Sequence, residues 1–120
     1  MQQKYSIKDE SYAFSMSIIQ LYLHLKKQGE YELSKQILRS GTSIGANIVE
    51  AQDAQSKKDF LHKMSIALKE AKETQYWLKL LIDSKFLTSY SDTKSIQSKC
   101  DEIVAVGTKI IISTKKNIAK

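Results

Sequence analysis

The 120-residue sequence contains no proline and only four glycines. A proline inside a helix removes a backbone donor and clashes with the preceding turn, so its absence allows long uninterrupted helices. The scarcity of glycine indicates loops that are few and short. The single cysteine, Cys100, cannot form an internal disulfide, and we interpret it as a small apolar filler in a late helix.

Long apolar runs and an export signal are also missing. Charged or polar residues cut every apolar stretch well short of the roughly 18 residues of a membrane-spanning helix. The N-terminal stretch MQQKYSIKDESY lacks an apolar segment followed by a small-residue cleavage site. We therefore expect a cytoplasmic protein with no membrane partner.

The residue types that build enzyme sites are sparse. The only histidines are His24 and His62, and the chain has one Asp-x-x-His pair, Asp59 with His62, where a di-metal bundle needs two such motifs plus further carboxylates. No zinc, redox or phosphate-loop motif occurs, and no histidine lies near Ser40 or Ser43 in the sequence. These absences predict a protein that is not an enzyme, with no metal, no cofactor and no small-molecule substrate.

The residues that are present follow helical spacing in four segments, residues 9–28, 31–54, 57–84 and 93–117. Ser6 and Ser56 are positioned to cap the first and third segments, and Gly29 to end the first. The 42% hydrophobic content is sufficient for one compact domain of this length. The expected fold is all-α, a single antiparallel up-down-up-down four-helix bundle.

The first segment is apolar over more than one face. Its main line has helical spacing at Tyr12, Met16, Ile19 and Leu23, and further apolar residues widen it: Phe14, Ile18, Leu21, Tyr22 and Leu25. We expect so broad a face to be covered on more than one side, by helices of the bundle or by another subunit.

Two glycines interrupt the core face of the second segment. Gly41 and Gly45 lie one turn apart, and each costs about 1 kcal/mol relative to alanine in a helix. The spacing indicates either a close approach by another helix or a local break. We favour the close approach because Ser43 and Ala46 keep the same region small.

Polar residues form a line beside these glycines, at Arg39, Ser43, Asn47 and Glu50. The third segment offers Glu70, Glu73, Tyr76 and Trp77 at similar spacing, and Lys69 can pair with Glu73 at i, i+4. The line is a solvated face, a structural polar network, or a ligand or nucleic-acid site. In the network, which we favour, the sole arginine pairs with a carboxylate such as Glu73 or Glu50, linking two helices or two subunits.

Charge is unevenly distributed. The chain has 19 basic and 13 acidic residues, a formal net charge of +6, and all the acids precede Ile103. Four lysines follow: Lys109, Lys115, Lys116 and Lys120. A basic balance favours anionic partners such as RNA or DNA, although the same lysines can serve solubility alone.

Several motifs resemble a known family. They are the stretch Gln36–Ala51 (QILRSGTSIGANIVEA), the Ser56-x-x-Asp59-Phe60 start, the sequence Ile66–Ala71 (IALKEA) and Glu73-Thr-x-Tyr-Trp-Leu78. Together they resemble the bacterial four-helix-bundle family first noticed in intervening sequences of large-subunit ribosomal RNA genes. The sequence is also more distantly similar to the accessory variability proteins of diversity-generating retroelements.

The resemblance implies an assembly. Members of this group are small bundles that form homopentamers, and the retroelement relatives bind a reverse transcriptase and nucleic acid through basic surfaces. Five copies of this chain would carry a formal charge of about +30, since each carries +6. We therefore expect a non-catalytic homo-oligomer that binds nucleic acid. The alternative is a protein-interaction scaffold that recruits a partner such as a reverse transcriptase.

Overall fold

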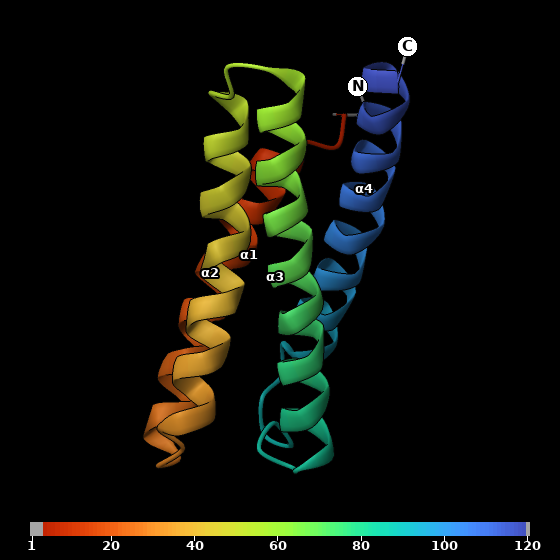
Figure 1. The fold of residues 1–120 in the computed structure, drawn as a ribbon. Helices are drawn as coiled ribbons and strands as arrows, with labels where there is room; N and C mark the ends of the chain where they lie inside the picture. The colour runs from red at the N-terminus through yellow and green to blue at the C-terminus, as the bar shows by residue number, and fades with distance from the viewer. Residues whose placement is uncertain (1–3, 120) are drawn as a thin grey trace.

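The computed structural model describes residues 4–119 as four helices joined by short connections. They are α1 (Ile7–Lys27), α2 (Glu32–Gln52), α3 (Lys57–Asp83) and α4 (Thr93–Ala119). Consecutive helices run in opposite directions, and α1 begins and α4 ends at the same end of the bundle (Figure 1). The all-α up-down-up-down prediction is confirmed, with each helix end within two residues of its expected position.

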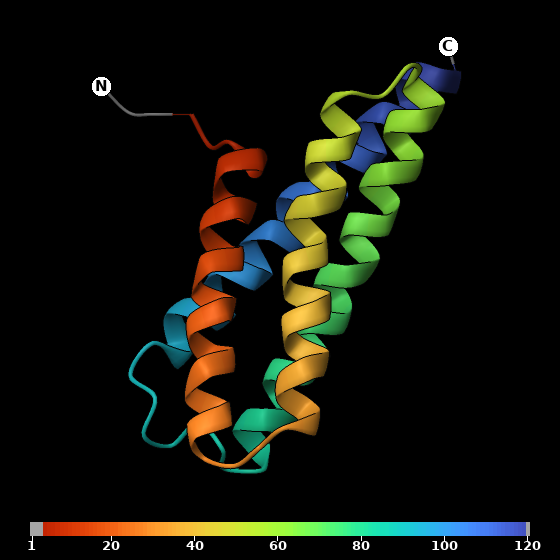
Figure 2. The same ribbon diagram turned by 90° about the vertical axis from the view of Figure 1, so that its left-hand side faces the viewer.

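Each helix lies against the two that precede or follow it around the bundle. α2 packs between α1 and α3, and α4 closes the ring against α3 and α1. α4 crosses the others obliquely (Figure 2). The buried faces of the last three helices are centred on Ile44 and Ile48 in α2, Ala71 and Leu78 in α3, and Cys100 in α4.

Local signals in the sequence explain where the helices begin and end. The Ser6 hydroxyl accepts a 3.2 Å hydrogen bond from the Asp9 amide, and the Ser56 hydroxyl accepts one of 3.0 Å from Asp59. Asp59 has a shorter side chain than the glutamate of the usual capping box. Its carboxylate accepts a hydrogen bond from the backbone amide of Gln55, one residue before the cap. Gly29 follows α1 with φ +82°, the left-handed conformation that ends many helices.

Helix α1 has two apolar lines, and only one of them faces the core. Tyr12, Met16, Ile19 and Leu23 are 41–68% exposed on the outer side of the helix. The face toward the core is instead formed by a second line of residues, all fully buried: Ser11, Phe14, Ile18, Leu21 and Leu25. The helices of the bundle therefore cover one of the two apolar lines expected on this segment, and the line through Tyr12 is exposed in the single chain.

The glycines of α2 mark that close contact. A Cβ at Gly41 would lie 2.8 Å from Ile18 Cγ1, and one at Gly45 would lie 3.3 Å from the Ser11 carbonyl oxygen and from Ser15 Oγ. The expected close approach by another helix is confirmed. The helix is α1 of the same chain.

Candidate nucleic-acid interface

Three of the four lysines that follow Ile103 project from the C-terminal half of α4. Lys109, Lys115 and Lys116 are exposed, and Lys120 lies outside the described residues. Lys109 and Lys116 are seven residues apart and share the outward face, since seven residues make about two helical turns. Lys115 points to the side, where α4 meets α3.

A shallow groove of about 390 Å³ runs between α3 and α4 on that side. Apolar side chains and Ser65 line it together with three lysines, Lys69, Lys72 and Lys115. Residues 103–119 of α4 contain no acid, and Asp59 is the only acid in residues 57–69 of α3. The groove is therefore a basic surface, which we call the α3–α4 lysine groove.

Two acids of α3, Glu70 and Glu73, face α2. Arg39 pairs there with Glu70 at 3.2 Å and also with Glu73. The Trp77 indole Nε1 donates a 2.9 Å hydrogen bond to the same Glu73 carboxylate. Because Glu73 is held by these two donors, the expected Lys69–Glu73 pair does not form, and Lys69 has no ion-pair partner within residues 4–119.

The other members of the polar line have separate roles. The Ser43 hydroxyl donates to the Arg39 carbonyl and the Asn47 amide to the Ser43 carbonyl, so both bond within α2. Glu50 pairs with Lys63 of α3 at 3.1 Å. The line thus links α2 to α3 at its two ends, through Arg39 and Glu50. The Arg39 side chain is 50% exposed, so its ion pairs lie at the surface.

Tyr76 is a candidate binding residue that sequence reasoning missed. The sequence pattern grouped it with Glu70 and Glu73, but its side chain is exposed and its ring meets the Trp77 ring edge-on, with centroids 5.2 Å apart. Tyr76 lies four residues beyond Lys72 and three before Lys79, on the outward face of α3. The lysine spacing around this tyrosine is the signal in the sequence that could have identified it.

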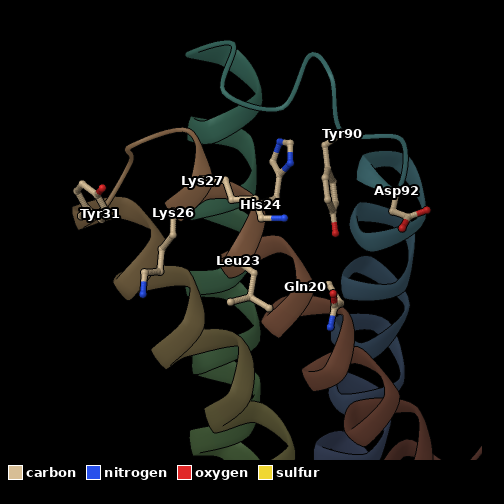
Figure 3. Close-up of a pocket in the computed structure, with 8 residues that line it drawn as sticks. All are labelled: Gln20, Leu23, His24, Lys26, Lys27, Tyr31, Tyr90 and Asp92. Atoms are coloured by element: carbon tan, nitrogen blue, oxygen red, sulfur yellow. The ribbon is translucent and has the colours of Figure 1, made fainter.

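A second hollow, of about 680 Å³, lies at the opposite end of the bundle beside the last turn of α1. Figure 3 shows the rings of His24 and Tyr90 side by side, and their centroids are 4.6 Å apart. Lys26 and Lys27 border the hollow, with Lys26 Nζ 5.2 Å from the centre of the Tyr22 ring. Burial and the Asp92 carboxylate raise the pKa of Tyr90.

The residues considered for catalysis lie apart from one another. His24 is near the end of α1 and His62 near the start of α3, at opposite ends of the bundle (Figure 1). Ser40 is fully buried, with its hydroxyl 2.9 Å from that of Thr74. Within residues 4–119, no three His, Cys, Asp or Glu side chains are grouped as metal ligands, and no helix is long and apolar enough to cross a membrane.

Comparisons with known proteins agree with the resemblance to the intervening-sequence family. Residues 3–109 match the family described as 23S rRNA-intervening sequence protein. The crystal structure of a protein of unknown function from the S23 ribosomal protein family of Bacteroides thetaiotaomicron is 50% identical, with a TM-score of 0.84 over 88% of this chain and 98% of that one. No curated protein matches. The chain therefore belongs to the family of 23S rRNA-intervening sequence proteins.

Proposed function

We propose that this protein is a non-catalytic accessory factor that binds RNA or DNA through the α3–α4 lysine groove. The observation that carries the proposal is the convergence of Lys69, Lys72 and Lys115 on one groove, without a carboxylate paired to any of them within the described residues. Lys109 and Lys116 extend the same basic surface over the outer face of α4. Lysines arranged in this way bind phosphates without reading sequence.

The basic surface gains strength from self-association. The exposed line Tyr12, Met16, Ile19 and Leu23 gives α1 an apolar outer face, which a second copy would remove from water. The assembly we propose is a homo-oligomer, with five copies as the number expected from the resemblance. Several copies would multiply the +6 charge of each subunit and raise the attraction for a polyanion.

The test is binding of a labelled RNA and a labelled DNA at increasing salt. Log Kd should rise linearly with log salt, because bound phosphates release counterions. The triple variant Lys69→Gln, Lys72→Gln, Lys115→Gln should weaken binding and reduce the salt slope by roughly one for each phosphate that the variant no longer binds. Binding of neither nucleic acid at low salt would refute the proposal.

A matched control separates a site from general charge. Lys35 on α2, Lys94 at the start of α4 and Lys27 at the end of α1 are all exposed and lie outside the groove. A triple glutamine variant at these positions removes the same charge. If it lowers affinity as much as the groove variant, net charge rather than the groove is responsible.

The alternative function is a protein-interaction scaffold that recruits a partner such as a polymerase. It is favoured by a groove of about 590 Å³ between α1 and α2, which is lined mostly by apolar surface, including Tyr12, Ile19 and Val49. Ile19→Glu tests whether the outer face of α1 joins copies of this chain or binds a different protein. If the variant keeps the native oligomer mass, α1 is free to receive a different protein.

A further inference from the structure

The α3–α4 lysine groove has an exposed aromatic ring at one end. Tyr76 is 61% exposed, although a tyrosine side chain usually covers much of its ring against neighbouring surface. Lys72 precedes Tyr76 by about one helical turn, or about 5.4 Å along the helix axis. Lys69 precedes Lys72 by about one further turn. The surface therefore combines phosphate-binding groups with an aromatic face.

The Tyr76 ring is supported on one side. Its edge-on contact with Trp77 holds the two centroids 5.2 Å apart. Trp77 is itself fixed through its 2.9 Å bond to Glu73, and Glu73 is paired with Arg39 of α2. The polar network between α2 and α3 thus holds Trp77 in place, and Trp77 in turn contacts Tyr76, which faces solvent.

Charged residues surround the Tyr76 ring unevenly, with lysines that make no ion pair within residues 4–119 on one side and acids on the other. Lys69 and Lys72 precede it on α3, and Lys79 follows it but is paired with Asp83 at 2.9 Å. Across the helix interface, Asp101 of α4 accepts a 2.8 Å bond from Gln75, so an acid bounds the groove beside Tyr76. The lysines consequently lie to one side of the ring, toward the C-terminal end of α4.

Resting on the function proposed above, we propose that the ligand of this groove is single-stranded nucleic acid, with a base stacked on Tyr76 and adjoining phosphates on Lys69, Lys72 and Lys115. In a duplex the base faces are covered by their neighbours, so an exposed ring gains nothing from them. In a single strand the base faces are accessible, and stacking on an aromatic ring tolerates every base. The ring thereby selects strandedness, while the lysines supply salt-sensitive affinity.

The experiment compares three labelled probes, an oligouridylate, an oligodeoxythymidylate and a duplex RNA of equal length, against the full chain. The single strands should bind more tightly than the duplex and with similar affinity to each other, because stacking does not require the 2′-hydroxyl. Tyr76→Ala should weaken single-strand binding roughly fivefold or more and leave duplex binding unchanged. Tyr76→Phe, which keeps the ring, should bind as the wild type does.

Trp77 provides a second readout, since it is the only tryptophan of the chain and its ring contacts Tyr76. Its emission should change on addition of unlabelled oligouridylate and not on addition of the duplex. Circular dichroism and unfolding of Tyr76→Ala should match the wild type, because the side chain lies largely in solvent.

The outcomes separate the two proposals. If no probe binds, the proposed function itself fails. If the duplex binds as tightly as the single strands, if Tyr76→Ala leaves single-strand binding intact, or if Tyr76→Phe loses as much as Tyr76→Ala, stacking on Tyr76 is refuted while nucleic-acid binding stands. A strict requirement for RNA over DNA would likewise overturn the stacking assignment.

Discussion

Gly41 of α2 lies directly against the side chain of Ile18 of α1. A Cβ on Gly41 would fall 2.8 Å from Ile18 Cγ1 and 2.9 Å from Cγ2. Both atoms are attached directly to the β-carbon of a β-branched residue, whose χ1 rotation is restricted. Ile18 therefore cannot yield without shifting the helix.

Gly41→Ala should destabilise the protein even though alanine favours the helix more than glycine. We expect a loss of about 1–3 kcal/mol in the free energy of unfolding, typical of overpacking in a core. Gly107→Ala is the matched control, since its Cβ would meet Leu68 Cδ1 at an ordinary 3.7 Å. That variant should be neutral or gain up to about 1 kcal/mol from helix propensity. Urea unfolding of both variants measures the contrast, and equal stabilities would contradict this account of the α1–α2 contact.

Arg39→Ala should cost less than the loss of a buried ion pair. Arg39 is half exposed, so solvent screens its attraction to Glu70 and Glu73, and we expect a loss of about 1 kcal/mol in urea unfolding. Trp77 emission should shift as well, because Glu73 loses the partner that holds it. Lys79→Ala, which removes a pair exposed on both sides, is the control and should change stability by less. A loss of several kcal/mol for Arg39→Ala would show that the pair behaves as a buried one.

Helical spacing and capping residues account for most of the fold. The caps at Ser6 and Ser56 depend only on neighbouring residues, so the sequence locates those helix starts to within two residues. In α1 the spacing alone was insufficient, because both Ile18 and Ile19 belong to apolar lines. Which line faces α2 depends on the contact with Gly41, and this contact is not local in the sequence.

The candidate site was partly predictable for a similar reason. Lys115 was identified from the acid-free end of the sequence, whereas the helical spacing of Lys69 and Lys72 in α3 does not show that they lie beside it. They line the same groove as Lys115 because of the way α3 is oriented when it packs against α4. The pairing of Arg39 with two carboxylates also depends on helix packing, and it is this pairing that leaves Lys69 without a partner among the described residues.

Cys100 should be unreactive in the native protein. Its side chain is fully buried, and burial together with the nearby Asp101 raises the pKa of its thiol from 9.0 to about 12. A thiol reagent at about pH 8 should label the unfolded chain rapidly and the folded chain only as fast as it opens. Fast labelling of the folded protein would contradict the buried position of Cys100.

The same shift predicts a pH dependence of stability. The folded state holds the Cys100 proton more tightly than the unfolded state, so the stabilisation is complete below pH 9.0 and is lost as pH rises toward about 12. Because tyrosines and lysines also titrate in this range, the measurement is the difference between wild type and Cys100→Ala in urea unfolding. The wild type should lose more stability than the variant across this window, and parallel curves would show that the thiol does not contribute.

Leu21 and Leu23 offer a direct test of the two faces of α1. Leu21 is fully buried and Leu23 is 45% exposed, although the residues are two positions apart on one helix. Leu21→Ala should cost about 3 kcal/mol in unfolding free energy, because it leaves a cavity in the core. Leu23→Ala should cost well under about 1 kcal/mol in the monomeric chain, as surface substitutions usually do.

For self-association, we expect Leu23→Ala to have a larger effect than Leu21→Ala. If the outer face of α1 joins copies of the chain, Leu23→Ala and Met16→Glu should lower the mass of the assembly in solution, since they weaken or charge an apolar contact surface. Leu21→Ala should keep the native mass under conditions where it is folded. Light scattering and urea unfolding, each measured at several protein concentrations, distinguish the two effects, because only losses at the outer face should depend on concentration. A native mass for Met16→Glu would exclude this face from the subunit interface.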